Sequence, residues 1–165
     1  MRVNTTPSHL WEKSWTNLNQ HQLEALACRL APLLKTGDVI FLHGDLGAGK
    51  STFARALIRQ TLNDKNAEVP SPTYTLVQSY EPENALPLWH YDLYRLSGVD
   101  DVYELGMDDA LDQGAALIEW PERLEGTLTP SLNIHLSAGK TPETRTITAS
   151  ATSEMAQHLA DWGRQ

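Results

Sequence analysis

Residues 44–51 read GDLGAGKS and match the phosphate-binding loop pattern G-x-x-x-x-G-K-[ST]. The residue types follow from the task of holding phosphate. Glycines let the backbone turn back on itself, so that successive N–H groups point into one concavity and bind phosphate oxygens. Lys50 supplies a mobile positive charge for the outer phosphates, and the Ser51 hydroxyl is a ligand for Mg²⁺.

The segments on either side of the loop have the patterns that the motif requires. Before it, residues 39–42 (VIFL) form a short apolar run that is typical of a buried strand. After it, the apolar residues of 51–62 recur at helical spacing. A helix that begins at Lys50 directs its dipole and its free N–H groups at bound phosphates. We therefore predict a site for a nucleoside triphosphate or diphosphate.

Composition excludes several other classes of protein. The 165 residues include 13 basic and 21 acidic side chains, giving a net charge of −8 without a basic stripe that would hold DNA or RNA. No segment approaches the roughly twenty apolar residues of a membrane span, and residues 1–20 lack the apolar core of a signal peptide. The single Cys28 allows no internal disulfide. We expect a cytoplasmic protein without membrane association, in which residues 1–165 form one domain.

Helical and strand-like patterns alternate along the rest of the chain. Asn19 and Gln22 form a capping-box pattern, so the first helix is expected to begin there and to end near Gly37. Two more helices are expected, over residues 100–111 and 152–162. Strands are expected at residues 73–77, 88–91, 115–118, 132–136 and 144–148, the last two as an antiparallel pair. The order predicts an α/β fold of the P-loop NTPase type, with a parallel core, antiparallel edge strands and helices on both faces.

Two carboxylates follow strands that are expected to lie near the loop. Asp92 follows residues 88–91, and Glu119 follows residues 115–118. In a doubly wound sheet, ligand-binding residues lie at the carboxyl ends of strands. Glu119 follows the cleaner buried strand and is the better metal-side carboxylate; Asp92 is either an outer ligand of the metal or the residue that orients the attacking water. Trp120 lies either near the nucleotide or in the core.

Other stretches resemble site motifs without matching them. Residues 138–141 (AGKT) copy the end of a phosphate loop, but the first glycine would fall at Ile134, so a plain loop is expected. Residues 63–66 (NDKN) are not the N-K-x-D guanine reader, which favours adenine as the base. The histidines show no metal-ligand spacing, so no zinc site is expected. His90 is within reach of Asp92 but is interpreted as a structural residue.

Four motifs occur together and in a fixed order: GDLGAGKSTF at 44–53, SPTYTLV at 71–77, HYDLYRL at 90–96 and IEWPER at 118–123. Together they resemble the TsaE family (also called YjeE), bacterial P-loop ATPases of tRNA threonylcarbamoyladenosine biosynthesis. The resemblance extends over about residues 19–145. Ser51 stands where the family usually has threonine, and its hydroxyl is still expected to ligate the metal.

The resemblance implies a weak Mg²⁺-dependent ATPase that binds ATP and ADP and acts with TsaB-like and TsaD-like subunits. The complex would transfer a threonylcarbamoyl group to the adenosine beside the anticodon, and this subunit would meet tRNA only through its partners. Lys50, Asp92 and Glu119 are implied to be catalytic, and residues 71–75 to form a switch-like loop. Ser51 and Glu119 would flank Mg²⁺. The residues implied to contact the nucleotide are Asp45, Leu46, Gly47, Ala48, Gly49, Lys50, Ser51, Thr52 and Trp120.

Two other classes of protein remain open. A small-molecule kinase uses the same loop but needs an acceptor pocket and an arginine-rich lid, for which Arg95, Arg123 and Arg145 are too scattered. The other class is a nucleotide-driven switch without significant hydrolysis. It differs from the implied ATPase only in whether ATP turnover is needed for its function.

Overall fold

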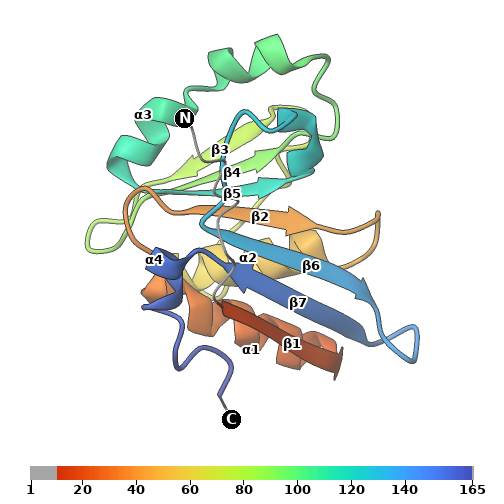
Figure 1. Ribbon diagram of the computed structural model, residues 1–165. Helices are drawn as coiled ribbons and strands as arrows, with labels where there is room; N and C mark the ends of the chain where they lie inside the picture. Colours follow the sequence, from red (N-terminus) through yellow and green to blue (C-terminus); the bar gives the residue numbers. More distant parts are fainter. Residues whose placement is uncertain (1–10, 165) are drawn as a thin grey trace, which may run out of the picture.

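A seven-stranded mixed sheet carries the other elements in the computed structural model, which describes residues 11–164 (Figure 1). The strands lie in the order β1-β7-β6-β2-β5-β4-β3. Their bounds are β1 Trp11–Leu18, β2 Val39–His43, β3 Val77–Tyr80, β4 Leu88–Asp92, β5 Ala115–Glu119, β6 Leu132–Ala138 and β7 Arg145–Ala151. The helical elements, with η for 3₁₀ helices, are α1 Gln20–Leu30, η1 Ala31–Leu33, α2 Lys50–Leu62, η2 Val99–Leu105, α3 Met107–Gln113, η3 Pro121–Leu124 and α4 Ser153–Ala156.

The four central strands, β6, β2, β5 and β4, are parallel to one another. β3 pairs antiparallel with β4 at one edge, while β7 and then β1 add antiparallel strands at the other. The predicted α/β fold with a parallel core and antiparallel edge strands is confirmed, with antiparallel pairing at both edges. Because the parallel strands end at the same edge of the sheet, the residues that follow them gather there.

Helices cover both faces of the sheet, as predicted, because the central strands are apolar on both sides. Along β2, Ile40 and Leu42 pack in the core formed with α1 and α2. Val39 and Phe41 pack on the opposite face, where η2, α3 and η3 lie. α2 begins at Lys50, as predicted, and buries the apolar residues Phe53, Ala54, Leu57 and Ile58.

The first helix begins as predicted but ends earlier. The Asn19 side chain accepts a hydrogen bond from the Gln22 N–H, and the Gln22 side chain accepts one from the Asn19 N–H, which completes the capping box. α1 ends at Leu30 rather than near Gly37. Pro32 has no N–H to donate to the preceding turn, so the chain continues as the short 3₁₀ helix η1.

Two predicted helices are wrong in extent. The helix expected over residues 100–111 is divided at Gly106, whose φ of 66° lies in the left-handed region, so η2 ends and α3 begins there. The helix expected over residues 152–162 is one turn long and is followed by turns. Glycine and turn geometry thus override the helical spacing in both segments.

The strand expected at residues 73–77 is also wrong, because β3 begins only at Val77. The preceding residues form a turn in which the Leu76 N–H donates to the Pro72 carbonyl oxygen at 2.7 Å. Leu76 has a φ of 68°, which is uncommon for leucine and ends the turn sharply. The segment 71–76 is therefore a structured loop beside the sheet and not part of it.

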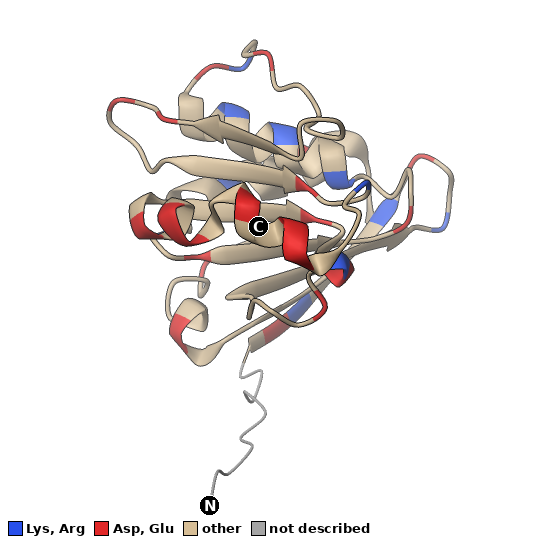
Figure 2. Ribbon diagram, turned by 90° about the horizontal axis from the view of Figure 1, so that it is seen from above, with Lys and Arg blue, Asp and Glu red and all other residues tan. Residues whose placement is uncertain are grey.

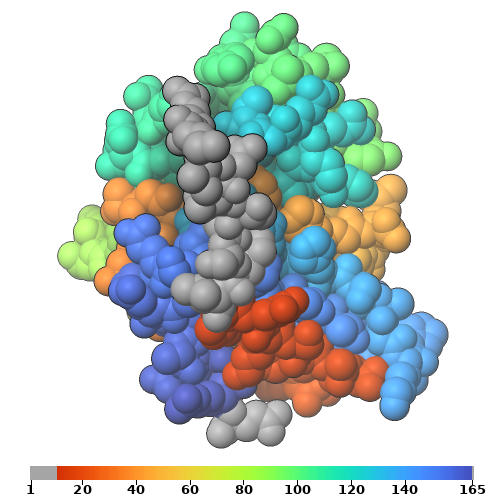
Figure 3. All heavy atoms as spheres, viewed as in Figure 1, coloured from red at the N-terminus to blue at the C-terminus, as the bar shows by residue number. Residues whose placement is uncertain are grey.

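β1 has no counterpart among the predicted elements. Trp11, Lys13 and Trp15 lie along its half-buried side, and a lysine in the middle of that side interrupts the apolar alternation of a strand pattern. Trp11 and Trp15 lie against Trp162, so that segments from both ends of the described chain meet at this edge (Figure 3). The strand is thus stabilised by long-range packing.

Charged residues are distributed unevenly along the ribbon (Figure 2). η2 and α3 carry acidic residues at 100, 101, 104, 108, 109 and 112, whereas α2 carries Lys50, Arg55 and Arg59. Negative charge is therefore concentrated on the face of the sheet opposite α1 and α2.

None of the helices within residues 11–164 is long and apolar enough to cross a membrane. Residues 1–10, which form half of the segment that lacks a signal-peptide pattern, lie outside the described residues, as does residue 165.

Candidate nucleotide-binding site

The phosphate loop connects β2 to α2 at the carboxyl edge of the parallel strands. Gly44, Gly47 and Gly49 have φ angles of 151°, 81° and 107°, which favour glycine. At Gly44 a Cβ atom would also lie 2.7 Å from the Leu136 carbonyl oxygen, so a larger residue does not fit. The loop therefore forms a backbone concavity at the N-terminus of a 13-residue helix, which is a favourable place for an anion.

Lys50 is almost buried at the start of α2, with 5% of its surface exposed. Its Nζ donates hydrogen bonds to the carbonyl oxygens of Gly44 and Asp45 and lies 4.4 Å from the centre of the Trp120 ring. Burial lowers the pKa of the Lys50 ammonium, and the nearby Glu119 carboxylate is the largest opposing influence. The ammonium is thus held by neutral acceptors, which an anionic phosphate can replace with a stronger interaction.

Asp92 and Glu119 are neighbours because β4 and β5 pair in register, with the two residues directly opposite each other. Side chains alternate along a strand, so Asp92 shares a face with Leu88, and Glu119 shares a face with Leu117. Both leucines pack in the core on the side of α1 and α2. The two carboxylates therefore point to the side of the sheet on which α2 begins.

Glu119 is buried, with 2% of its surface exposed, and uses both carboxylate oxygens. Oε1 accepts a hydrogen bond from the Ser51 hydroxyl at 3.4 Å, and Oε2 lies 2.7 Å from Nε2 of His90. His90 thus contacts Glu119, whereas Asp92, the partner considered from the sequence, accepts hydrogen bonds from Thr73 and Tyr94. A carboxylate and a hydroxyl, completed by phosphate and water oxygens, are a donor set that fits Mg²⁺.

Asp92 is hydrogen-bonded to the segment predicted to be a switch-like loop. Its Oδ2 accepts from the Thr73 hydroxyl at 3.1 Å, and its Oδ1 accepts from the Tyr94 N–H at 3.1 Å. The Ser71 hydroxyl lies 2.6 Å from the Thr73 hydroxyl and extends the chain of contacts. Side-chain hydrogen bonds therefore connect Asp92 to Thr73 and, through it, to Ser71.

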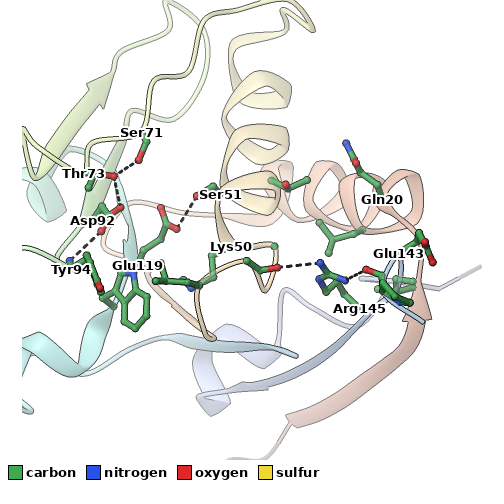
Figure 4. Close-up of a pocket in the computed structure, with 18 of the residues that line it drawn as sticks. Gln20, Lys50, Ser51, Ser71, Thr73, Asp92, Tyr94, Glu119, Glu143 and Arg145 are labelled. Carbon is green, nitrogen blue, oxygen red and sulfur yellow. Dashed lines mark hydrogen bonds between the residues drawn. The ribbon is translucent and has the colours of Figure 1, made fainter. Parts of the chain in front are cut away.

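These groups line one cavity of about 670 Å³, a size typical of small-molecule sites (Figure 4). Figure 4 shows Ser71, Asp92 and Glu119 toward one end and Gln20 and Arg145 toward the other. The predicted site residues that line the cavity are Leu46, Gly47, Gly49, Lys50, Ser51, Thr52, Asp92, Glu119 and Trp120.

Two of the predicted nucleotide-contacting residues do not line this cavity. Asp45 belongs to the loop but is exposed beside it. Ala48 is buried and packs in the core beneath the loop. The nucleotide contact expected of these two residues stays a prediction.

Arg145 belongs to the cavity wall and is predicted by no motif. Its Nη2 donates to the Gly47 carbonyl oxygen at 3.1 Å, and its Nη1 donates to the Pro142 carbonyl oxygen at 2.7 Å. The hairpin between β6 and β7 brings Arg145 to a loop that lies 98 residues away in the chain. The contact depends on the register of that hairpin, for which the sequence contains no local signal.

The family model described as "Threonylcarbamoyl adenosine biosynthesis protein TsaE" matches residues 18–147. The chain is similar to the tRNA threonylcarbamoyladenosine biosynthesis protein TsaE of Rickettsia felis, with 43% identity over 114 residues that cover 69% of this chain. That match spans 66% of the Rickettsia felis protein, just under two thirds of its length. The protein of the same name from Bacillus subtilis is 37% identical over 115 residues, which cover 69% of this chain and 70% of that protein.

Among solved structures, the crystal structure of Bacillus subtilis YdiB resembles this chain with a TM-score of 0.69 and 31% sequence identity. The likeness covers 92% of this chain and 93% of that chain. It therefore extends over nearly the whole of both folds.

Proposed function

The chain belongs to the TsaE family of threonylcarbamoyl adenosine biosynthesis proteins, and on that basis we propose that it binds ATP with Mg²⁺ and hydrolyses it slowly. The observation that carries this proposal is the meeting of a complete phosphate loop with two carboxylates in one cavity. We take residues 1–165 as a single P-loop ATPase domain, because one sheet carries both parts of that site.

The chain's own groups divide the work of binding and hydrolysis. The loop amides and Lys50 bind the outer phosphates, while Ser51 and Glu119 hold Mg²⁺. When bound, the metal neutralises charge that develops on the transferring phosphoryl group. Trp120, which contacts Lys50, lies beside the nucleotide and shields the phosphates from water.

Asp92 orients the attacking water. To do so, its Oδ2 exchanges the hydrogen bond from Thr73 for one from that water. The exchange frees the Thr73 and Ser71 hydroxyls, so the conformation of residues 71–75 responds to the nucleotide state, as switch loops do.

ATP hydrolysis by this chain supports threonylcarbamoyl transfer to the adenosine beside the anticodon of tRNA. The chain acts with TsaB-like and TsaD-like subunits, and the tRNA is held by that complex in the cytoplasm. A net charge of −8 supports an indirect encounter with tRNA, since a direct one would be opposed by charge repulsion.

Reconstitution of the complex tests the proposal. The chain alone should hydrolyse ATP slowly and modify no tRNA. With both partner subunits, threonylcarbamoyl-adenylate and a substrate tRNA, the native chain should give multiple turnovers of modification, and Lys50→Ala should not. Equal multiple turnover with Lys50→Ala would contradict the proposal, and phosphoryl transfer from ATP to a small metabolite would favour a kinase instead.

Calorimetry tests the choice of base. ATP is expected to bind more tightly than GTP, because the guanine-reading motif is missing from the sequence. If GTP bound at least tenfold more tightly than ATP, a difference of about 1.4 kcal/mol in binding free energy, the assignment of adenine as the preferred base would be wrong.

A further inference from the structure

The buried contact between His90 and Glu119 joins two parallel strands immediately beneath the phosphate loop. His90 has 3% and Glu119 has 2% of its surface exposed, and the Nε2 and Oε2 atoms lie 2.7 Å apart. A buried carboxylate oxygen needs a donor, since an unpaired buried charge is costly. Nε2 therefore carries the proton, and the imidazole donates to Glu119.

His90 has one polar anchor rather than two. Its Nδ1 is buried and has no hydrogen-bond partner among residues 11–164. A histidine that served the core as a structural bridge would normally use both ring nitrogens. The orientation of this ring is instead set by β4 and by its contact with the carboxylate.

The contact also selects which carboxylate oxygen faces the cavity. With Oε2 held by His90, the other oxygen, Oε1, lies toward the hydroxyl of Ser51. Ser51 and Glu119 are the two groups that hold Mg²⁺ in the proposed function. A carboxylate free to rotate would offer Oε1 in this direction only part of the time.

We infer that His90 is a positioning residue, which fixes the Glu119 carboxylate so that Oε1 is presented to the metal beside Ser51. The inference rests on the proposed function. Outer partners of this kind typically change metal affinity by about 10- to 100-fold when they are removed. His90 does not line the cavity, so its effect on binding is assigned to its contact with Glu119.

Titration of Mn²⁺, followed by electron paramagnetic resonance with the protein in excess over ADP, measures metal binding without turnover. His90→Leu should weaken Mn²⁺ binding by about 10- to 100-fold, while the affinity for metal-free ADP stays near that of the native chain. His90→Gln keeps an N–H donor and should lose less affinity than His90→Leu. In a Glu119→Gln background, His90→Leu should add little further loss, because the carboxylate that it positions is already gone.

The outcomes separate this inference from the proposed function. Unchanged Mn²⁺ affinity in His90→Leu overturns the positioning role, as does an equal further loss in the Glu119→Gln background. A parallel loss of thermal stability and of metal-free ADP affinity in both His90 variants also overturns it, in favour of a packing role. If the native chain binds Mn²⁺ no better with ADP than without it, the proposed function itself fails.

Discussion

At the scale of single residues, Lys50 is held by carbonyl oxygens of its own loop and must exchange them for phosphate. Lys50→Ala should lower ATP turnover by about a hundredfold or more, the scale of losing one oriented charge at a transition state. Phosphate release measures the turnover, and circular dichroism should show an unchanged fold. Lys140→Ala is the matched control, because Lys140 belongs to the exposed AGKT hairpin, and it should leave turnover unchanged. Comparable turnover in Lys50→Ala and the native chain would contradict the site.

Glu119 and Asp92 are adjacent, but their different partners predict different losses. Glu119→Ala should raise the Mg²⁺ concentration needed for activity, because Ser51 would be left without its carboxylate partner. Asp92→Ala should lower turnover with ATP affinity nearly unchanged, which marks an interaction made mainly in the transition state. Mg²⁺ titrations of turnover and calorimetry with ATP distinguish the two variants. The opposite pattern would mean that their roles are exchanged. Glu83→Ala, at an exposed position outside the cavity lining, serves as the control.

The sequence predicts these carboxylates because their position after apolar strands is a local signal. The hydrogen-bond partners of these carboxylates are not predicted by the sequence. Thr73 and His90 contact Asp92 and Glu119 through loop geometry and strand register, and Arg145 reaches the phosphate loop through a distant hairpin. Such contacts are properties of the assembled sheet, so no window of sequence reveals them.

At the scale of elements, Gly106 separates η2 from α3 through its left-handed backbone. An added Cβ would meet no atom within 4 Å, so the cost of Gly106→Ala is one of backbone conformation. The substitution should lower the free energy of unfolding by about 1–2 kcal/mol, measured by urea denaturation.

Gly98 provides a matched control for that prediction. It has the same open surroundings, but its φ of −168° is extended and available to any residue. Gly98→Ala should change the free energy of unfolding by less than about 1 kcal/mol, with stabilisation the more natural sign. An equal loss in both variants would show that the left-handed geometry of Gly106 is not the cause.

β2, α2 and β5 are predicted correctly because their apolar residues follow a clear strand or helix pattern and are buried in the fold. They also occur in the order that the phosphate-loop motif and an α/β fold require. β1 is missed because Lys13 interrupts the apolar side of an edge strand. The region 100–111 is predicted as one helix because its spacing is helical, although backbone geometry at Gly106 decides the outcome. The spacing of apolar residues therefore predicts buried helices and strands better than it predicts edge strands or the interruption of a helix.

At the scale of the whole molecule, Trp162 joins β1 and α1 near the end of the described chain. It is fully buried, donates from its Nε1 to the Leu26 carbonyl oxygen at 2.9 Å, and packs against Trp11 and Trp15. Trp162→Ala should lower the free energy of unfolding by about 3–5 kcal/mol. Trp162→Phe keeps most of the packing and loses only the hydrogen bond to the Leu26 carbonyl oxygen, so it should cost less. Urea denaturation checks the order, and a loss below 1 kcal/mol in Trp162→Ala would show that the cluster is dispensable.

The parallel centre of the sheet also has a consequence for the order in which the protein folds. Phe41 pairs with Ile118 across a long stretch of chain, whereas β6 and β7 are joined by a short hairpin. Loop-closure entropy delays distant pairings, so the hairpins should form before β5 docks beside β2. An intermediate of that kind has its phosphate loop but lacks Glu119 beside it. In stopped-flow refolding, Mg²⁺-dependent nucleotide binding should therefore appear only with the slowest phase. Nucleotide and Mg²⁺ present together during synthesis would protect finished molecules and leave incomplete ones to proteases.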